Sequence, residues 1–292
     1  MTAIDKLREL SQLFTKAGIP EPTKEAATLL TETLNISSAA LHASPHEIDG
    51  NTATQIDALA ARRVRGEPLQ YLIGHVDFWG MSIQVGKGVL IPRPETELMV
   101  EETIRIMMDA GAARQLAFTE AGPRINILDL CTGSGCIALA LAKEFPQAAV
   151  YGIDKSAAAL AYARKNADCN RIGNVTFIEG DLFRPLNSGL LFDCIISNPP
   201  YIRSNDISGL QKEIGHEPAE ALDGGESGLD YYNEILKEAP RHLDKKGIVI
   251  LEIGFDQADD VRRIAAQHGF RDIRFIKDYA GFKRIFVAKL YS

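Results

Sequence analysis

The residues best suited to chemistry in this chain are Asn198, Pro199, Pro200 and Tyr201. They follow residues 191–197, a short apolar run that is typical of a buried parallel strand. Proline cannot donate to a strand ladder and holds the residue before it in an extended conformation, so the strand must end here. We therefore expect the Asn198 side chain and the adjacent carbonyls to be held past the carboxyl end of the strand, where ligands bind in open α/β sheets.

An amide oxygen beside a fixed carbonyl can accept both hydrogens of a planar –NH2 group. Tyr201 can lie over the plane of that group. The stretch is therefore suited to gripping an amide or aromatic amine nitrogen while one face stays open. The alternative is a simple turn, because Asn and Pro are common in turns.

A glycine-rich loop upstream suits a nucleotide-like ligand. The run from Asp129 to Ala138 leaves one predicted strand and opens a helix, and its Gly133 and Gly135 permit a close approach of a ligand. Asp154 ends the next predicted strand, where its carboxylate can accept two hydrogen bonds from a ribose diol. Enzymes that bind NAD and enzymes that bind S-adenosylmethionine share this pattern, and a plain strand-to-helix turn is a further alternative.

The following strands favour methyl transfer over hydride transfer. Asp181 ends the third predicted strand, well placed for an adenine amino group, and Asn198 ends the fourth. A nicotinamide enzyme usually needs a proton donor near the hydride acceptor, and no such pairing stands out in the sequence. Methyl transfer from a sulfonium mainly needs alignment and a dry, polar-lined site. Two acceptors on the hydrogens of an amide nitrogen would also add electron density to this poor nucleophile.

Length and composition bound the possibilities. The chain has 292 residues, which suits one large and one small domain, and its net charge of −7 disfavours a large footprint on nucleic acid. No apolar run approaches the ~20 residues of a membrane span, and the first residues have no signal-peptide core. The four cysteines form no Cys-x-x-Cys pair and the six histidines show no metal-ligand spacing. We therefore expect buried free thiols in a reducing cytosol and no structural metal.

Three regions must position these residues. Residues 1–66 carry apolar positions at helical spacing between prolines and predict a small helical bundle. Residues 67–92 show strand-like alternation between glycines, including residues 70–73, and predict a β-hairpin linker. In residues 93–292, a helix and a loop over residues 111–123 precede alternating strands and helices that end in two paired strands. Repeated βα units of this kind predict a doubly wound α/β sheet with an antiparallel C-terminal edge.

The glycine-rich loop, Asp154, Asp181 and the Asn198 motif together resemble class I S-adenosylmethionine-dependent methyltransferases that modify amide or exocyclic amino nitrogens. More specifically, the chain resembles the HemK/PrmC family, the protein-(glutamine-N5) methyltransferases of peptide-chain release factors. Four stretches carry this resemblance: Gly66–Gly74, Phe78-Trp79, Val89–Glu97 and Glu217–Leu229. The resemblance covers essentially the whole chain, and residues 91–97 are highly specific to the family. One departure is Cys131, where many members have glycine, and a small thiol should fit there.

The resemblance implies roles for individual positions. It assigns the methionine and ribose parts of S-adenosylmethionine to Cys131, Thr132, Gly133, Ser134, Gly135 and Asp154. Asp181 and Leu182 would flank the adenine, and Asn198 would contact both cofactor and substrate. The substrate glutamine would be held by Asn198, Pro199, Pro200 and Tyr201, and the catalytic residues among them would be Asn198, Pro199 and Tyr201.

Three further charged residues have open roles. In one alternative Arg93, Pro94 and Glu97 border the pocket, and in the other Arg93 and Glu97 only form a structural pair with each other. Glu252 ends the fifth predicted strand and is more consistent with a structural role.

We therefore expect a cytosolic, monomeric enzyme that methylates the glutamine side-chain amide in the Gly-Gly-Gln motif of class-1 release factors, with S-adenosyl-L-homocysteine as the second product. No membrane and no stable nucleic-acid partner are expected. A glycine-rich loop offers little surface for recognition, so residues 1–66 are expected to dock on the body of the release factor. One alternative is a nucleic-acid amino methyltransferase, which must accept a flipped or unpaired base and which the acidic balance disfavours. The other is a cofactor-binding module without catalysis, which the intact Asn198 motif disfavours.

Overall fold

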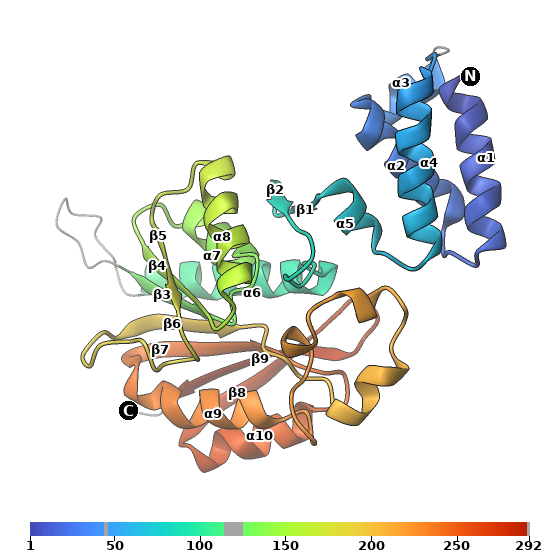
Figure 1. Ribbon diagram of the computed structural model, residues 1–292. Coiled ribbons are helices and arrows are strands. Elements are labelled where there is room, and N and C mark those ends of the chain that lie inside the picture. The colour runs from blue at the N-terminus through green and yellow to red at the C-terminus, as the bar shows by residue number, and fades with distance from the viewer. Residues whose placement is uncertain (44–45, 114–124, 291–292) are drawn as a thin grey trace. The chain divides into compact units, whose positions relative to one another are not determined.

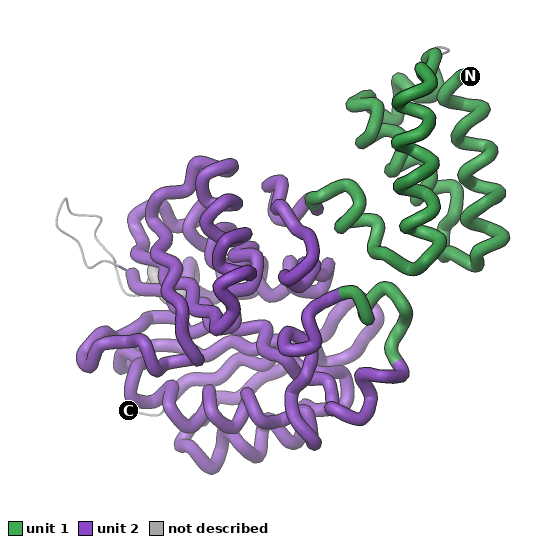
Figure 2. The backbone as a smooth tube through the Cα atoms, in the orientation of Figure 1, with its two compact units in different colours: residues 1–75, 210–216 green, residues 76–209, 217–292 purple. Residues whose placement is uncertain are grey.

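The structure is a computed structural model, and it describes residues 1–43, 46–113 and 125–290. The chain forms two compact units, shown in different colours in Figure 2. The first unit comprises residues 1–75 and 210–216, and the second comprises residues 76–209 and 217–292. The first unit is therefore built from two separate stretches of the sequence.

The first unit is helical. Its α-helices are α1 (Ala3–Lys16), α2 (Pro22–Leu34), α3 (Ser38–Ala43), α4 (Gly50–Val64) and α5 (Leu69–Ile73) (Figure 1). Apolar side chains on facing sides of these helices meet in one core, which includes the fully buried Leu10, Phe14, Leu30 and Ile56. Burial of each such side chain contributes ~1.5–3 kcal/mol, so the unit has a core of its own. The predicted helical N-terminal region is confirmed.

A buried cation joins the two stretches of the first unit. Arg63 is only 3% exposed, and it donates to Glu25 through Nε at 2.6 Å and through Nη2 at 3.1 Å. Its Nη1 donates to Glu213 at 3.0 Å, and Glu213 lies in the segment 210–216. Because a buried guanidinium is tolerated only when it is paired, this charge-assisted bond fixes the segment to α4.

Residues 70–73 belong to α5, so the strand expected there is wrong. Pro68 is held in a conformation that can start a helix, and Gly74 ends it in the left-handed region with a φ of 88°. Leu69 and Ile73, four residues apart, both pack against the core of the first unit. A four-residue apolar run does not distinguish a strand from a short helix by its alternation alone.

The predicted hairpin is confirmed in β1 (His75–Phe78) and β2 (Met81–Gln84). Its turn residues, Trp79 and Gly80, both have positive φ values of 51° and 63°, as a tight two-residue hairpin turn requires. The backbone N–H of Trp79 donates to Glu97 Oε1 at 2.9 Å, which helps to hold a non-glycine residue in this conformation.

The second unit contains a seven-stranded sheet in the order β5-β4-β3-β6-β7-β9-β8. Its strands are β3 (Asn126–Leu130), β4 (Ala149–Asp154), β5 (Val175–Glu179), β6 (Phe192–Ser197), β7 (Leu243–Glu252), β8 (Phe270–Lys277) and β9 (Lys283–Leu290). All neighbours are parallel except β9, which lies antiparallel between β7 and β8. The predicted doubly wound sheet with an antiparallel edge is confirmed.

Helices cover both faces of this sheet. They are α6 (Pro94–Ala113), α7 (Cys136–Glu144), α8 (Ala157–Asn170), α9 (Asp230–Glu238) and α10 (Ala258–Gln267). Figure 1 shows α6, α7 and α8 on one face and α9 and α10 on the other. The central strands are therefore buried on both sides, as the fully buried Cys194, Ile195 and Ile196 of β6 illustrate.

The order of the sheet reverses between β3 and β6. From β3 the chain continues to β4 on one side, whereas β6 adds to the other side of β3. The Ser197 hydroxyl at the end of β6 donates to the carbonyl of Leu130 at the end of β3, at 2.6 Å. The loops after these two strands diverge from this point, which is where open α/β sheets bind their ligands.

Some smaller expectations are settled by the described residues. Cys136 and Cys194 are buried free thiols, whereas Cys131 is intermediate and Cys169 is exposed on α8, so burial of all four thiols is wrong. The loop expected over residues 111–123 begins inside α6, and its remainder from residue 114 lies outside the described residues.

Within the described ranges, His, Cys, Asp and Glu side chains form no group that could hold a metal ion. None of the described helices combines the length and apolar character needed to cross a membrane.

Candidate active site

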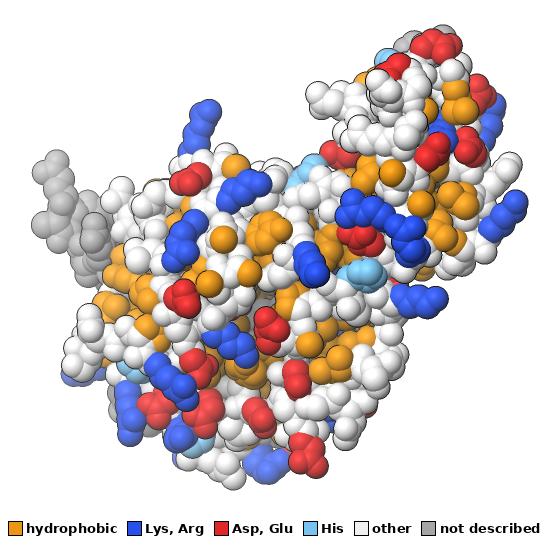
Figure 3. Space-filling model, viewed as in Figure 1, with side chains coloured by type: hydrophobic (Ala, Val, Ile, Leu, Met, Phe, Trp, Pro, Cys, Tyr) orange, Lys and Arg blue, Asp and Glu red, His pale blue; other side chains and the backbone are white. Residues whose placement is uncertain are grey.

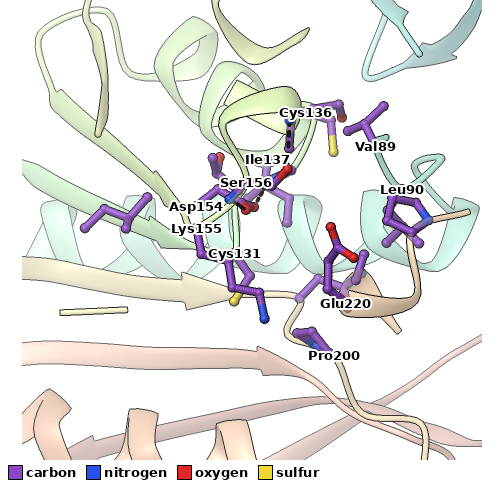
Figure 4. Close-up of a pocket in the computed structure, with 18 of the residues that line it drawn as sticks. Val89, Leu90, Cys131, Cys136, Ile137, Asp154, Lys155, Ser156, Pro200 and Glu220 are labelled. Atoms are coloured by element: carbon purple, nitrogen blue, oxygen red, sulfur yellow. Dashed lines mark hydrogen bonds between the residues drawn. The ribbon is translucent and has the colours of Figure 1, made fainter. Parts of the chain in front are cut away.

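A cavity of about 840 Å³, part of it open to solvent, lies at the carboxyl ends of β3, β4 and β6 (Figure 4). All of its lining residues belong to the second unit. Nine of the residues singled out in the sequence line it: Cys131, Thr132, Gly133, Ser134, Asp154, Asp181, Leu182, Asn198 and Pro200. The fold therefore brings the glycine-rich loop, the acids after two strands and the Asn-Pro-Pro motif to one site.

The loop after β3 turns sharply before α7 begins. Cys131, Gly133 and Gly135 have φ values of 57°, 56° and 79°, all in the left-handed region. A Cβ placed on Gly133 would meet only the Cys131 carbonyl, at 3.9 Å, so the space beside this residue is open for a ligand. Gly135 does not line the cavity. A Cβ there would lie 3.0 Å from both Ala163 and Phe177, so this glycine permits close packing of the loop on its own fold.

Asp154 is fixed by two backbone donors. Its Oδ2 accepts from the N–H of Gly133 and its Oδ1 from the N–H of Ser156, each at 2.8 Å. Burial raises the pKa of this carboxyl, and the two hydrogen bonds oppose that shift. Each oxygen of a carboxylate has about two acceptor sites, so each still has one for a ligand hydroxyl. Asp154 can therefore accept a pair of adjacent hydroxyls.

Asp181 and Leu182 follow β5 and line the cavity. Leu182 has a φ of 49°, and Asp181 forms a 2.9 Å ion pair with the exposed Arg184. The left-handed conformation of a leucine is costly, and such conformations cluster at ligand sites.

Only two of the four residues of the Asn198 motif line the cavity. Asn198 and Pro200 line the cavity, whereas Pro199 and Tyr201 do not. Asn198 Nδ2 donates to Thr96 Oγ1 at 3.2 Å. The Tyr201 hydroxyl is directed at Glu252 Oε1, 3.4 Å away, and burial raises the pKa of this phenol.

The backbone of this motif is held from behind. Gln257 Nε2 donates to the carbonyls of Tyr201 and Gly228, at 2.9 and 3.1 Å. Residue Ile202 pairs with Asp223 in an isolated parallel bridge, so the run 217–229 lies against the end of the motif. The backbone of the Asn198 motif is thus held in place by other segments of the second unit.

Arg93 and Glu97 do not line the cavity, and each has a different partner. Arg93 Nη2 donates to Glu217 Oε1 at 2.5 Å, and the other oxygen of Glu217 accepts from the N–H of Ile91 at 3.0 Å. Glu97 instead accepts from Trp79. Glu217, whose side chain is 1% exposed, thus ties the run 89–97 to the run 217–229 and shapes one wall of the site.

Several lining residues were not singled out from the sequence. Lys155 Nζ donates to the Tyr231 hydroxyl at 2.6 Å, and both residues line the cavity. Glu220 points into the space between Cys131 and Leu90 in Figure 4. Lys155 directly follows Asp154, and Glu220 lies in the family-specific run 217–229, so position next to a motif was the available signal.

The site carries an excess of negative charge. Asp154, Asp181 and Glu220 line the cavity, and Lys155 is the one cation among the lining residues. Beneath the loop, burial raises the pKa of Asp129 to about 7, although Thr132 and Ala138 donate to its Oδ2. Its Oδ1 is buried with no hydrogen-bond partner among the described residues. Such a site suits a ligand with positive charge and disfavours the pyrophosphate of a dinucleotide.

Known proteins match the chain over its whole length. A PrmC N-terminal domain model matches residues 5–74, and a methyltransferase domain model matches residues 122–254. A release factor glutamine methyltransferase of Thermodesulfovibrio yellowstonii is 43% identical over 288 residues, which are 98% of each chain. The chain belongs to the release factor glutamine methyltransferase family. Another member, from Geobacter sulfurreducens, is 38% identical over 92% of this chain and 89% of its own. The resemblance inferred from the sequence is confirmed.

The family membership makes this chain an enzyme that transfers methyl groups. A solved methyltransferase from Pyrococcus furiosus matches the fold with a TM-score of 0.51 and 18% sequence identity, over 82% of this chain and 98% of its own. At this identity the likeness concerns the fold alone, and it supports the class I methyltransferase architecture.

Proposed function

We propose that this enzyme transfers a methyl group from S-adenosylmethionine to the side-chain nitrogen N5 of a glutamine in the Gly-Gly-Gln motif of class-1 release factors. The observation that carries the proposal is that Asp154 and Asn198 line the same cavity. The Asp154 side chain is suited to bind a ribose, and the Asn198 side chain is suited to bind an amide. The name of the relative that is 43% identical over the full length supports the same substrate.

The residues present fit S-adenosylmethionine, which would supply a methyl group on a sulfonium. Asp154 has a free acceptor site on each oxygen for the ribose hydroxyls. Asp181 can accept from the adenine amino group, and Leu182 and Ile153 supply apolar surface beside it. The negative excess of the cavity favours a cationic cofactor over NAD, so it separates the two cofactors that the glycine-rich loop leaves open.

The Asn198 motif would bind the accepting amide. Asn198 Oδ1 and an adjacent backbone carbonyl of the motif would accept the two hydrogens of the glutamine –NH2, and Pro200, which also lines the cavity, would lie beside it. An amide nitrogen is a weak nucleophile because its lone pair is delocalised. Fixed acceptors orient that lone pair and favour the loss of delocalisation as the methyl group arrives.

The first unit is proposed to bind the body of the release factor. Residues 5–74 match a PrmC N-terminal domain and carry none of the residues that line the cavity. Remote contacts can hold a small reacting group in place. Hydrogen exchange of the full enzyme should then slow in α1–α4 when release factor is added, and unchanged exchange there would refute docking by this unit.

A nucleic-acid substrate is the competing function. The viewed face in Figure 3 carries interspersed acidic and basic side chains, and the net charge of −7 gives no general attraction to phosphates.

Release factors work on the ribosome, so we also propose that the enzyme acts in the cytosol. We further propose that it is a monomer, which analytical ultracentrifugation can verify.

One labelling experiment tests the function. The enzyme is incubated with methyl-labelled S-adenosylmethionine and either whole release factor, a release factor with its Gly-Gly-Gln glutamine changed to asparagine, or total RNA. We expect label only on the unaltered release factor, with the added mass on that glutamine by peptide mapping. Label on RNA, or equal label on the altered release factor, would overturn the proposal.

A further inference from the structure

Two residues at the wall of the cavity form a relay of hydrogen bonds with Asn198, which is proposed to hold the substrate amide. Thr96 lines the cavity and bonds to Asn198 directly, whereas Glu252 is linked to Asn198 through Thr96. Thr96 comes from the first turn of α6, and Glu252 is the last residue of β7. Thr96 Oγ1 donates to Glu252 Oε2 at 2.7 Å, and the same oxygen accepts from Asn198 Nδ2 at 3.2 Å. Both residues are only 2% exposed, so water does not compete for these bonds.

We infer that Thr96 and Glu252 are positioning residues that set the orientation of the Asn198 amide, so that its oxygen and not its –NH2 faces the reacting nitrogen. This inference rests on the proposed function, because it concerns the group that accepts the hydrogens of the substrate glutamine. It assigns a role in the reaction to two residues that the sequence left open or did not single out.

The direction of these hydrogen bonds follows from Glu252, the last acceptor in the series Asn198, Thr96, Glu252. Burial raises the pKa of Glu252 to about 7, so this carboxyl is ionised above that pH, and an ionised carboxylate can only accept. Two hydroxyl groups converge on it, that of Thr96 on Oε2 and that of Tyr201 on Oε1. The Thr96 proton is therefore committed to Glu252. The lone pairs that remain on Thr96 Oγ1 can pair only with a donor, and the donor end of Asn198 is its –NH2 group.

The opposite orientation of the amide would be harmful. If Asn198 turned its –NH2 toward the cavity, that group would face the –NH2 of the substrate, and two donors cannot bond to each other. Asn198 Oδ1 and Glu252 Oε2 would then also compete for the single hydroxyl proton of Thr96. Thr96 and Glu252 remove this orientation before the substrate arrives, which is preorganisation of a binding group.

A purely structural role is the competing explanation. Thr96 and Glu252 also join α6 to β7, so their bond could serve only to attach a helix to the sheet. The chain offers a matched control for this possibility. Thr103 lies on the same helix, is fully buried, and donates its hydroxyl to the carbonyl of Met99 at 2.7 Å, away from the cavity lining.

The test compares Thr96→Val, Thr96→Ser, Thr103→Val and the wild type on whole release factor at about pH 8, where Glu252 is ionised. Valine keeps the shape of threonine and removes the hydroxyl, whereas serine keeps the hydroxyl. We expect Thr96→Val to lower kcat by ~10²-fold, the usual effect of losing one positioning group, with little change in cofactor Kd. Thr96→Ser should recover most of that loss, and Thr103→Val should stay near wild-type kcat.

Two results would overturn the inference. One is a Thr96→Val enzyme with wild-type kcat, and the other is a loss that serine does not repair. A thermal unfolding curve for each variant shows whether the two valine variants lose similar stability. An inactive wild type would instead refute the proposed function itself, so the two failures are distinguishable.

Glu252→Gln provides a second measurement that does not depend on turnover. Glutamine offers one acceptor where the carboxylate offers two, so Thr96 and Tyr201 can no longer both donate to it. With asparagine side chains labelled with ¹⁵N, the wild type should show nuclear Overhauser contacts between the Asn198 –NH2 and Thr96. We expect Glu252→Gln to weaken these contacts, and their absence from the wild type would refute the assigned orientation.

Discussion

Gly224 lies so close to Tyr201 that a Cβ built on the glycine would be 2.7 Å from the tyrosine Cα. The same Cβ would be 2.8 Å from the carbonyl oxygen of Pro200. Both neighbours are backbone atoms of the Asn198 motif, so they cannot move aside as the end of a flexible side chain could. The absence of a side chain at Gly224 therefore allows the run 217–229 to pack directly on the motif.

Gly224→Ala should displace the backbone at Pro200 and Tyr201 and lower kcat by ~10²-fold, since a shift of about 1 Å in a positioned group has effects of this size. Cofactor affinity should change less, because Asp154 lies on a different strand. Gly209→Ala is the matched control, since a Cβ there meets nothing within 4 Å. Steady-state kinetics of both variants would contradict the argument if Gly224→Ala retained the activity of Gly209→Ala.

Asp154→Ala should weaken S-adenosylmethionine binding by at least tenfold. The carboxylate is proposed to accept the ribose hydroxyls, and a hydrogen bond to a charged group contributes ~1.5–3 kcal/mol. Calorimetric titration of the folded variant measures the change directly. Wild-type affinity in Asp154→Ala, or preferential binding of NAD by the wild type, would contradict the cofactor assignment.

Cys131→Gly should stabilise the protein slightly. The left-handed conformation costs an L-residue roughly 1–2 kcal/mol, and the greater freedom of unfolded glycine takes back about 0.5–1 kcal/mol. The expected net gain is therefore about 0.5–1 kcal/mol, which raises Tm by a few degrees at this chain length. Cys131→Val, with a β-branched side chain at a φ of 57°, should lower Tm. If valine is tolerated as well as glycine in thermal unfolding, the backbone at this position is not strained.

The stability of the protein should fall as the pH rises through neutrality, in part because of Glu252. Burial raises the pKa of this carboxyl from 4.5 to about 7. The folded state therefore prefers the protonated form, and this contribution is complete below pH ~4.5 and is lost as the pH rises through ~7. At 1.36 kcal/mol per pKa unit, the change between about pH 5 and pH 8 is on the order of 2 kcal/mol.

Glu252→Gln removes this titration and isolates its effect. The free energies of unfolding of wild type and variant, from urea denaturation at both pH values, should shift relative to each other by that amount in favour of the variant at high pH. The buried Asp129 titrates in the same range in both proteins and cancels from the comparison. An equal difference at the two pH values would show that Glu252 does not titrate there.

The sequence was sufficient for the βα repeat and for the residues that directly follow the strands. Asp154, Asp181 and Asn198 are each placed by the end of a strand, and in parallel sheets such ends meet at one edge, so local pattern predicts long-range proximity. The hairpin was predictable from the strand-like alternation on either side of Gly80, whereas nothing in the sequence indicated the positive φ of Trp79.

The contacts that the sequence did not predict are made by residues that do not follow a strand of the sheet. Thr96 reaches Asn198 from a helix 102 residues earlier, and Glu217 bonds to Ile91 across 126 residues. No periodic pattern in the sequence indicates either of these pairings, because tertiary packing alone brings the two segments of each pair together. The helix over residues 69–73 was mistaken for a strand because its burial depends on the core of the first unit.

The two stretches of the first unit limit how this unit could be exchanged between members of the family. A chimaera that takes residues 1–75 from a relative would keep the native segment 210–216. Its Glu213 would then have to match a foreign partner in place of Arg63, and its Lys212 would have to fit beside a foreign residue in place of Gly66. The first unit is therefore compact in space but is built from two separate stretches of the sequence. A working graft must carry both stretches together.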